Sequence, residues 1–257
     1  MLELNGLYKV FNAGTVNEKR AIDGLDLTLE EGDFVTVIGG NGAGKSTTLN
    51  LIAGVFPADR GTIRLNGVDI TRLPEHKRAK YLGRVFQDPM MGTAATMGIE
   101  ENLALANRRG KSRGLRPGIT SQERELFRAQ LAALGLGLEN RLTSKVGLLS
   151  GGQRQALTLL MATLNQPKLL LLDEHTAALD PKTADLIMEL TDKIVKQKNL
   201  TTIMVTHNLR YAVEYGNRLL MMHQGEAVMD LSAKEKQELK VEDILEKFNA
   251  ISIECGN

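Results

Sequence analysis

This sequence has a single cysteine, no long apolar run and no marked excess of either charge. Its only cysteine, Cys255, has no partner for an internal disulfide, which indicates a reducing compartment. No stretch approaches the roughly 18 uncharged apolar residues of a membrane-spanning helix. Residues 1–10 lack the apolar core of a signal peptide. We therefore expect a cytoplasmic protein that contacts a membrane only through a partner.

The near balance of charge excludes one class of partner. Lys and Arg total 32 against 31 Asp and Glu, so no overall field attracts nucleic acid or an acidic surface. The 257 residues are within the range of one large α/β domain, and the 42% hydrophobic and 25% charged residues are ordinary for a soluble globular protein. A core can therefore form without disulfides or a structural metal.

Hydrophobic patterns predict a mixed α/β sheet. Residues 2–29 are β-like, and residues 25–29 alternate as in a half-buried strand. Two apolar runs, 34–38 and 169–172, are typical of buried parallel strands, and 203–205 is a shorter candidate. Helical patterns separate these runs, as in an α/β fold.

Turn residues and caps locate the remaining elements. Asn66-Gly67, between apolar neighbours, is a strong hairpin signal. A second pair of strands is expected at 219–222 and 227–229, followed by a polar helix from about 233 to 247.

The middle of the chain has a different pattern. From about 88 to 149 it shows helices and loops but no convincing strand. Thr120 and Glu123 form a capping box, and Phe127 and Leu131 continue as a helical apolar stripe. We interpret this region as a helical subdomain inserted into the α/β core.

A glycine-rich segment lies directly after the strand expected at 34–38. Its residues match G-x-x-x-x-G-K-[ST]: Gly39, Gly40, Asn41, Gly42, Ala43, Gly44, Lys45 and Ser46. The glycines let backbone N–H groups converge on an anion, and the next helix adds its N-terminal partial charge. Lys45 is expected to reach the β- and γ-phosphates, Ser46 to coordinate Mg²⁺ and Thr47 to add a phosphate contact. A chance glycine turn is the alternative, against which the flanking strand and helix argue.

Two acids, Asp173 and Glu174, end the apolar run 169–172. The carboxyl end of a buried strand is where an α/β sheet places its ligand. Asp173 suits the acid that orients Mg²⁺, and Glu174 suits a general base for the attacking water. Surface acids that close a strand are the alternative, which the neighbouring phosphate loop disfavours.

Residues 149–153 carry a more specific motif. They read Leu-Ser-Gly-Gly-Gln, which resembles the signature of ABC ATPases. Residues 85–88 resemble that family's Q-loop, 178–180 its D-loop, and Thr206-His207 its switch histidine. The resemblance covers nearly the whole chain. It implies a P-loop NTPase core with an antiparallel β subdomain and an inserted α-helical subdomain, and hydrolysis of ATP with Mg²⁺.

The signature has a physical interpretation. Ser150 can cap the helix that follows, whose free N–H groups form an anion site. Lys45 and the glycine loop already serve the phosphates in the same subunit, so this second site is spare within a monomer. The resemblance implies that Ser150, Gly151, Gly152 and Gln153 bind ATP held by a second copy, closing a head-to-tail C₂ dimer that hydrolysis opens. An ordinary helix cap is the alternative.

The resemblance also implies roles for single residues. His207 would hydrogen-bond the γ-phosphate, Gln87 would contact Mg²⁺ or water, and Asp180 would lie at the dimer interface beside ATP. Phe11 stands where the family stacks an aromatic ring on adenine, with Tyr8 as its rival and a core role as the alternative. Without the resemblance, a lone histidine is more often structural.

One position departs from the family pattern. His175 stands where Pro or Ser is usual, and a location near the dimer interface would let it tune the response to pH. Residues 173–180 read DEHTAALD, which resembles a branch of bacterial importer ATPases with members associated with amino-acid uptake.

Two groups of side chains suggest contacts with partners. The stretch 107–118 is basic, and a solvated loop is favoured over contact with anionic lipid or an acidic partner loop. Its basic residues are Arg108, Arg109, Lys111, Arg113 and Arg116. An apolar cluster after the Q-loop would form either a groove for a permease's coupling helix or ordinary core. Its residues are Met90, Met91, Met97 and Ile99.

We expect a single domain over residues 1–257. Segments 1–87 and 151–230 form the nucleotide-binding core, 88–150 the helical signature subdomain, and 231–257 a C-terminal helix and tail.

The motif set predicts the ATPase subunit of a transporter, and the resemblance favours an importer. It would pair with a second copy and dock near 88–105 on a separate permease at the inner face of the cell membrane. A solute-binding protein completes such systems, and no nucleic-acid partner is expected. One alternative is a soluble ABC ATPase for a cytosolic assembly such as iron–sulfur cluster assembly. Another is a nucleotide-gated clamp without turnover, against which Glu174 and His207 argue.

Overall fold

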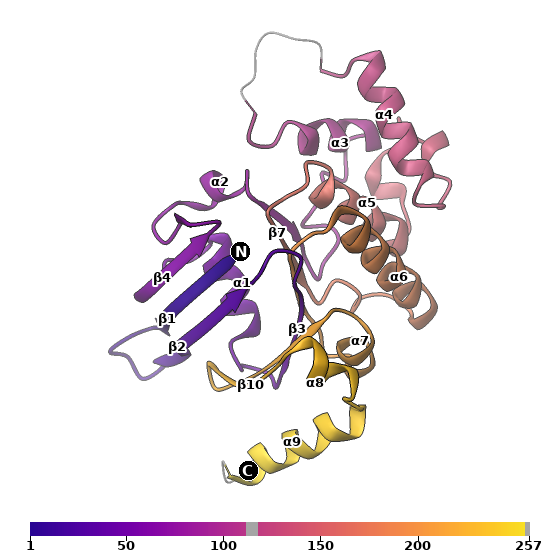
Figure 1. The fold of residues 1–257 in the computed structure, drawn as a ribbon. Helices are drawn as coiled ribbons and strands as arrows, with labels where there is room; N and C mark the ends of the chain where they lie inside the picture. Colours follow the sequence, from indigo (N-terminus) through magenta and orange to yellow (C-terminus); the bar gives the residue numbers. More distant parts are fainter. Residues whose placement is uncertain (112–117, 255–257) are drawn as a thin grey trace.

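The computed structural model describes residues 1–111 and 118–254 (Figure 1). The strands are β1 (Leu2–Phe11), β2 (Lys19–Leu29), β3 (Phe34–Gly39), β4 (Arg60–Leu65), β5 (Val68–Asp69), β6 (Leu82–Val85), β7 (Leu169–Asp173), β8 (Thr202–Val205), β9 (Arg218–His223) and β10 (Glu226–Leu231). The helices are α1 (Lys45–Ala53), α2 (Glu75–Arg78), α3 (Ile99–Asn107), α4 (Ser121–Ala132), the 3₁₀ turns η1 (Leu138–Asn140) and η2 (Val146–Leu148), α5 (Gly151–Thr163), α6 (Pro181–Lys198), α7 (Leu209–Glu214), α8 (Ala233–Gln237) and α9 (Val241–Glu254). Arg113, Arg116 and Cys255 lie outside the described residues.

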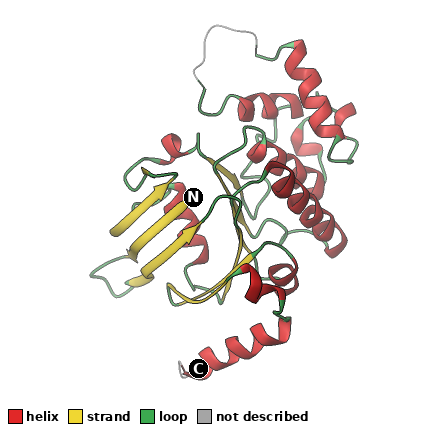
Figure 2. Ribbon diagram, viewed as in Figure 1, coloured by secondary structure: helices red, strands yellow, loops and turns green. Residues whose placement is uncertain are grey.

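Two sheets form the body of the molecule (Figure 2). The smaller sheet is antiparallel, in the order β2-β1-β4-β5. Its β4–β5 hairpin turns at Asn66 and Gly67, whose φ angles of 49° and 77° are the positive values that a tight hairpin turn requires. The larger sheet has the order β10-β9-β3-β8-β7-β6, with only β10 antiparallel to its neighbour among the described strands. The expected mixed α/β architecture is confirmed.

Strand β6 is an addition that the sequence pattern does not predict. Its four residues include Gly83 and Arg84, neither of which favours a strand. The strand packs tightly against α5, because a Cβ atom at Gly83 would lie 2.5 Å from the carbonyl oxygen of Ala162. Tertiary packing therefore selects this strand, and it forms the edge of the sheet beside β7.

The larger sheet separates two hydrophobic clusters. Val35 and Val37 of β3 face the cluster that contains α1 and the antiparallel sheet, whereas Phe34 faces the cluster of α5 and α6. On β7, Leu171 faces the first cluster and Leu172 the second. Each fully buried Val or Leu contributes about 1.5–3 kcal/mol. The period-2 pattern thus packs both faces of one sheet.

Helices α3 and α4 lie at one end of the molecule (Figure 1). Helix α4 begins with the expected capping box, in which Thr120 Oγ1 accepts from the N–H of Glu123 at 3.2 Å. Phe127 is fully buried, and so is Ile99, which therefore belongs to the core rather than to an open groove. No helix in the described part of the chain is long and apolar enough to cross a membrane.

The described basic residues of 107–118 contact the chain itself. The Arg108 guanidinium lies 3.4 Å from the Glu123 carboxylate, and Arg109 Nη2 donates to the carbonyl of Ala162 at 3.0 Å. Lys111 Nζ donates at 3.3 Å to the side-chain oxygen of Asn165. These contacts favour the interpretation of a local loop over that of a lipid-binding segment.

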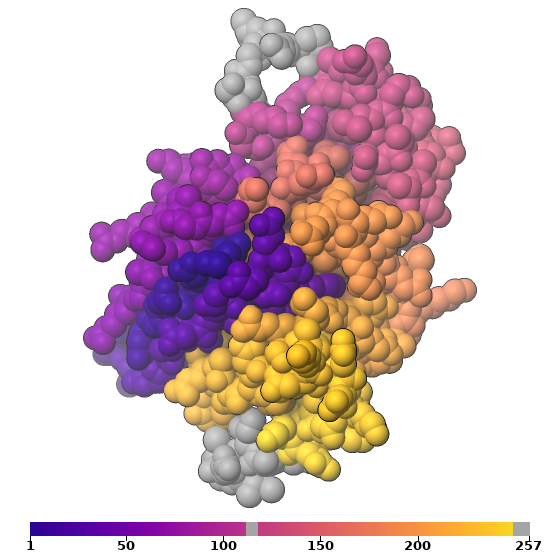
Figure 3. Space-filling view, in the orientation of Figure 1, coloured from indigo at the N-terminus to yellow at the C-terminus, as the bar shows by residue number. Residues whose placement is uncertain are grey.

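The continuous helix expected at 233–247 is wrong, because two helices occupy this region at the opposite end from α4 (Figures 1 and 3). Helix α9 has its own start, where the Asp243 carboxylate accepts from the N–H of Lys240 at 2.8 Å. On α8, Lys236 turns inward and donates to Thr36 Oγ1 at 3.0 Å and to the carbonyl of Tyr215. Burial lowers the pKa of Lys236 to about 7. Lys236 thus anchors α8 to β3 and to the end of α7, while α9 begins separately at Val241.

Candidate active site

Three neighbouring parallel strands bring the expected catalytic residues to one edge of the larger sheet. The glycine loop begins where β3 ends, His207 follows β8, and Asp173 is the last residue of β7. Gln87 follows β6, the next strand in the sheet. The carboxyl ends of parallel strands form the ligand-binding edge of such sheets. The strand order therefore explains why residues far apart in sequence meet here.

The glycine loop adopts conformations that other residues resist. Gly39, Gly42 and Gly44 have φ angles of 152°, 80° and 100°. A Cβ at Gly39 would lie 2.3 Å from the carbonyl oxygen of Met222, and one at Gly44 would lie 2.6 Å from that of Ala21. The loop is thus closed by backbone on its inner side, and α1 starts immediately after it.

Lys45 is held in place before any ligand arrives. Its Nζ donates to the carbonyls of Gly39 at 2.7 Å and Gly40 at 3.0 Å. Burial lowers the pKa of Lys45, and the nearby charges of Glu174 and Asp173 oppose that shift. A phosphate entering the loop therefore meets a positioned, poorly hydrated cation.

Ser46 and Asp173 provide the oxygen atoms expected for Mg²⁺. Ser46 Oγ donates to Asp173 Oδ1 at 3.0 Å. Mg²⁺ prefers hard oxygen ligands and takes only one or two from protein, the rest coming from phosphate and water. The donor set therefore fits Mg²⁺ bound together with a nucleotide.

Glu174 and His207 face each other across the site. His207 Nε2 lies 2.6 Å from Glu174 Oε1. The Glu174 backbone has a φ of 47°, in the left-handed region that costs a non-glycine residue about 1–2 kcal/mol. Such strain persists only where the surroundings enforce it, and it is common at catalytic positions.

One pocket joins the glycine loop to the catalytic pair. Its walls include Phe11, Lys19, Glu174 and His207 together with Asn41, Gly42, Ala43, Gly44, Lys45, Ser46 and Thr47. Tyr8 instead packs its hydroxyl against Gly24. The geometry therefore favours Phe11 over Tyr8 for adenine stacking, although Phe11 also makes an edge contact with Phe56 at 5.3 Å between ring centroids.

The signature residues, all of which the structure describes, do not line this pocket. Ser150 caps α5: its Oγ accepts from the N–H of Gln153 at 3.3 Å, and Gln153 Oε1 accepts from the N–H of Ser150 at 3.3 Å. Ser150 and Gly151 are exposed. A Cβ at Gly152 would lie 2.4 Å from Thr183 Cγ2, so this glycine also permits close packing of α5 on α6.

Gln87 and Asp180 lie outside the pocket as well. Gln87 lines a neighbouring cavity together with Asp173. Asp180 caps α6, where its Oδ1 accepts from the N–H of Thr183 at 3.1 Å, and it is exposed. His175 is only 2% exposed, and burial lowers its pKa to about 4, so it stays neutral at physiological pH. That burial argues against the expected role in tuning the pH response.

The structure adds three residues that motif analysis does not find. Lys19 Nζ lies beside Gly42, 3.2 Å from where its Cβ would be. Arg84 Nη2 donates to Asn50 Oδ1 at 2.6 Å and lies 3.8 Å from Asp173. Arg154 donates from α5 to backbone carbonyls of η2 and its C-cap, which fixes the loop before the signature. Arg84 and Arg154 adjoin the Q-loop and signature motifs in sequence, whereas Lys19 has no such signal.

Comparisons with known proteins identify the family of this chain. The ABC transporter family model matches residues 22–177. A tyrosine transport ATP-binding protein of Clostridioides difficile is 49% identical over 248 residues, 96% of this chain and 98% of that protein. A methionine import ATP-binding protein of Enterococcus faecalis is 34% identical over 96% of this chain and 67% of its own length.

A solved structure shares the architecture. A dimeric ATP-binding cassette in a post-hydrolysis state, bound to ADP and Pi, aligns with a TM-score of 0.77 and 29% identity. The alignment covers 91% of this chain and 99% of that one. The family model covers more than half of the chain, and the relatives with 49% and 34% identity cover nearly all of it. The chain therefore belongs to the ABC transporter family, and it is an ATP-binding, Mg²⁺-dependent ATP-hydrolysing subunit.

Proposed function

We propose that this chain powers an importer for an amino acid. The relative with 49% identity is named for tyrosine transport, and another relative is named for methionine import. The near-complete coverage of the first relative is the observation that supports this cargo class most strongly. The cytosolic iron–sulfur alternative has no comparable support among these relatives.

Two copies of the chain would close around two ATP molecules. The supporting observation is the separation of two phosphate-binding elements: Lys45 lines the pocket, whereas Ser150 and Gly151 are exposed elsewhere. A C₂ axis brings the exposed element of each copy to the pocket of the other. Asp180, also exposed beside this surface, would contact the partner. A bacterial ABC transporter cassette among the structural relatives is itself dimeric.

The residues of the pocket divide the chemistry among them. Lys45 holds the β- and γ-phosphate charge, and Glu174 orients and polarises the attacking water. His207 holds the Glu174 carboxylate in line through its Nε2. Its contact with the γ-phosphate is what the family resemblance implies. Ser46 and Asp173 would hold Mg²⁺, which when bound would supply positive charge for the phosphate oxygens. Gln87 would report this state to the helical region that it precedes.

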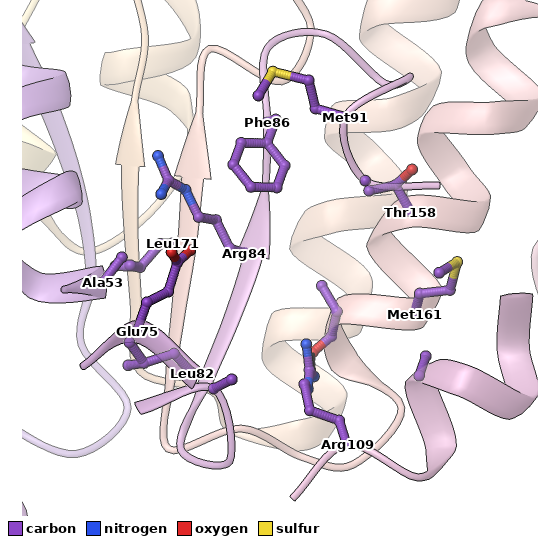
Figure 4. Close-up of a pocket in the computed structure, with 14 residues that line it drawn as sticks. Ala53, Glu75, Leu82, Arg84, Phe86, Met91, Arg109, Thr158, Met161 and Leu171 are labelled. Atoms are coloured by element: carbon purple, nitrogen blue, oxygen red, sulfur yellow. Dashed lines mark hydrogen bonds between the residues drawn. The ribbon is translucent and has the colours of Figure 1, made fainter. Parts of the chain in front are cut away.

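The permease would dock where the core meets the helices. A cavity there is lined by Arg84 and Phe86 on the core side and by Thr158 and Met161 of α5 on the other (Figure 4). Met91, 69% exposed, lies at its rim (Figure 4). Residues near 88–105 thus offer adaptable methionine surface next to the Q-loop. The chain would be peripheral on the inner face of the membrane through this contact.

Co-purification from native membranes tests this proposal. A tagged chain, gently extracted, should bring a multi-span permease and, in the complete system, a solute-binding protein that mass spectrometry identifies. Recovery of only soluble partners would instead support a cytosolic assembly ATPase. A Met91→Glu variant, which places a charge on the exposed rim, should no longer bring down the permease. The ATPase activity of the isolated variant should equal that of the natural chain.

A further inference from the structure

His175 connects the residue after Glu174 to the middle of α6. Its Nε2 lies 3.1 Å from Thr191 Oγ1, and both side chains are buried. The preceding residue is Glu174, with its left-handed backbone, and the loop 174–180 leads from β7 to α6. A buried polar side chain at this place is unlike an ordinary surface loop residue.

The direction of this hydrogen bond follows from the second bond of Thr191. The Thr191 hydroxyl donates its only proton to the carbonyl of Ile187 at 2.7 Å. Its oxygen is therefore left to accept, and His175 Nε2 must carry the proton that it donates. One tautomer and one orientation are thus defined.

The loop is fixed to the same helix at both of its ends. At its far end, the Asp180 carboxylate caps α6 through the N–H of Thr183 at 3.1 Å. At its near end, His175 bonds Thr191, one side chain away from the catalytic peptide. Between them, the carbonyl of Glu174 accepts from the N–H of Ala177 at 2.9 Å. These bonds hold the strained Glu174 backbone in a conformation that an unanchored loop would leave.

We propose that His175 is a positioning residue for ATP hydrolysis: its bond to Thr191 fixes the backbone of Glu174, and thereby the carboxylate against His207. His175 touches no substrate and acts only through Glu174. This inference rests on the proposed role of Glu174 as the residue that polarises water. The residue that breaks the family pattern in this chain therefore serves the catalytic step rather than a response to pH.

Two matched pairs of variants test it by steady-state ATPase kinetics. Thr191→Val removes the acceptor at equal volume, and Thr191→Ser keeps it. His175→Leu removes the donor, and His175→Gln places an N–H group at a similar distance along the side chain. Thr191→Val and His175→Leu should lower kcat about tenfold with KM for ATP unchanged, because a misplacement of about 1 Å at a catalytic group can cost up to about a hundredfold. The two retaining variants should stay within about threefold of the natural chain.

A double-mutant cycle separates positioning from general stability. The combined His175→Leu and Thr191→Val variant should be no slower than the slower single variant, since both remove one bond. Lower melting temperatures with normal kcat in Thr191→Val would overturn the proposal. So would equal kcat losses in Thr191→Val and Thr191→Ser. If the natural chain itself hydrolyses no ATP, the proposed function fails. If the natural chain hydrolyses ATP and Thr191→Val and His175→Leu have the same kcat as it has, this inference alone fails.

Discussion

Two helix N-termini in this molecule look alike in sequence but are prepared differently. Both α1 and α5 follow a glycine-containing loop, and neither has an acid in its first turn. At α1, whose residues are all described, no side chain caps the N-terminus, and the N-cap is Gly44. At α5, Ser150 and Gln153 form a complete capping box.

The difference teaches how the two sites divide their work. The free N–H groups of α1, with Lys45 beside them, are left for phosphate inside the same chain. At α5 the side chain of Ser150 already accepts from the N–H of Gln153, and Ser150 and Gly151 are exposed. This end therefore suits a weaker contact that forms only when a second copy arrives. ATP therefore binds first at the internal site, the N-terminus of α1. The dimer closes in a separate step at the external site, the N-terminus of α5.

The largest effect is expected at the internal site. Lys45→Ala should lower ATPase activity about a thousandfold, because the phosphates lose a prepositioned cation. Lys168→Ala, an exposed lysine next to the opposite end of β7, is the control and should leave the rate unchanged. A colorimetric phosphate-release assay measures the ATPase rate of both variants. Near-normal turnover in Lys45→Ala would contradict the assignment of α1 as the stronger phosphate site.

The external site should affect closure rather than binding. Glu174→Gln should halt turnover and trap an ATP-bound dimer, visible by size exclusion with light scattering. Adding Ser150→Ala should raise the ATP concentration needed for the dimer about tenfold, matching the 0.5–2 kcal/mol typical of a lost cap contact. ATP binding to the monomer should stay the same.

The control for that experiment removes another cap. Thr120→Ala deletes the corresponding capping bond of α4 and should not alter the dimer. If Ser150→Ala instead weakened ATP binding to the monomer, the N-terminus of α5 would bind ATP of its own chain, and its assignment to the ATP of a second copy would be wrong.

A smaller effect is expected from the second cation of the internal site. Lys19→Gln should raise KM for ATP about threefold, in keeping with the modest strength of exposed charge interactions. Arg20→Gln, which removes the neighbouring exposed cation paired with Asp23, should not change KM. Equal shifts in both variants would indicate a general charge effect rather than a contact near Gly42.

A further effect concerns stability between pH 6.5 and 4. His175 has its pKa lowered from 6.5 to about 4 on folding, so the unfolded chain binds the proton more readily in this range. The contribution to stability is fully present above pH 6.5 and falls by up to about 3 kcal/mol as the pH drops toward 4. Urea denaturation across this range should show a shallower loss for His175→Gln. Parallel curves for both proteins would contradict the burial of a neutral ring.

The sequence predicts those parts of the site that depend on local chemistry. The glycine loop, the acids at the end of β7 and the capping Ser150 all follow from short-range rules. The inward position of Lys236 does not, because its bond to Thr36 joins residues 200 positions apart.

Arg78 shows the same limit. It is 1% exposed, and its guanidinium donates to the carbonyls of Leu51 and Ile52 near the end of α1. No local pattern indicates that a charged residue will complete the hydrogen bonds of a distant helix terminus. The left-handed Glu174 is likewise imposed by packing around it rather than by its own preference.

The alternating faces of β3 and β7 have a consequence for how such a protein changes over time. Side chains that point toward α1 share few neighbours with those that point toward α5 and α6. Substitutions at sites that share no partners combine additively in free energy. During evolution, substitutions on the α5 and α6 side can therefore adapt the chain to a new docking partner without changing the α1 side, which binds ATP. The larger sheet thus separates two hydrophobic clusters whose residues can be substituted independently.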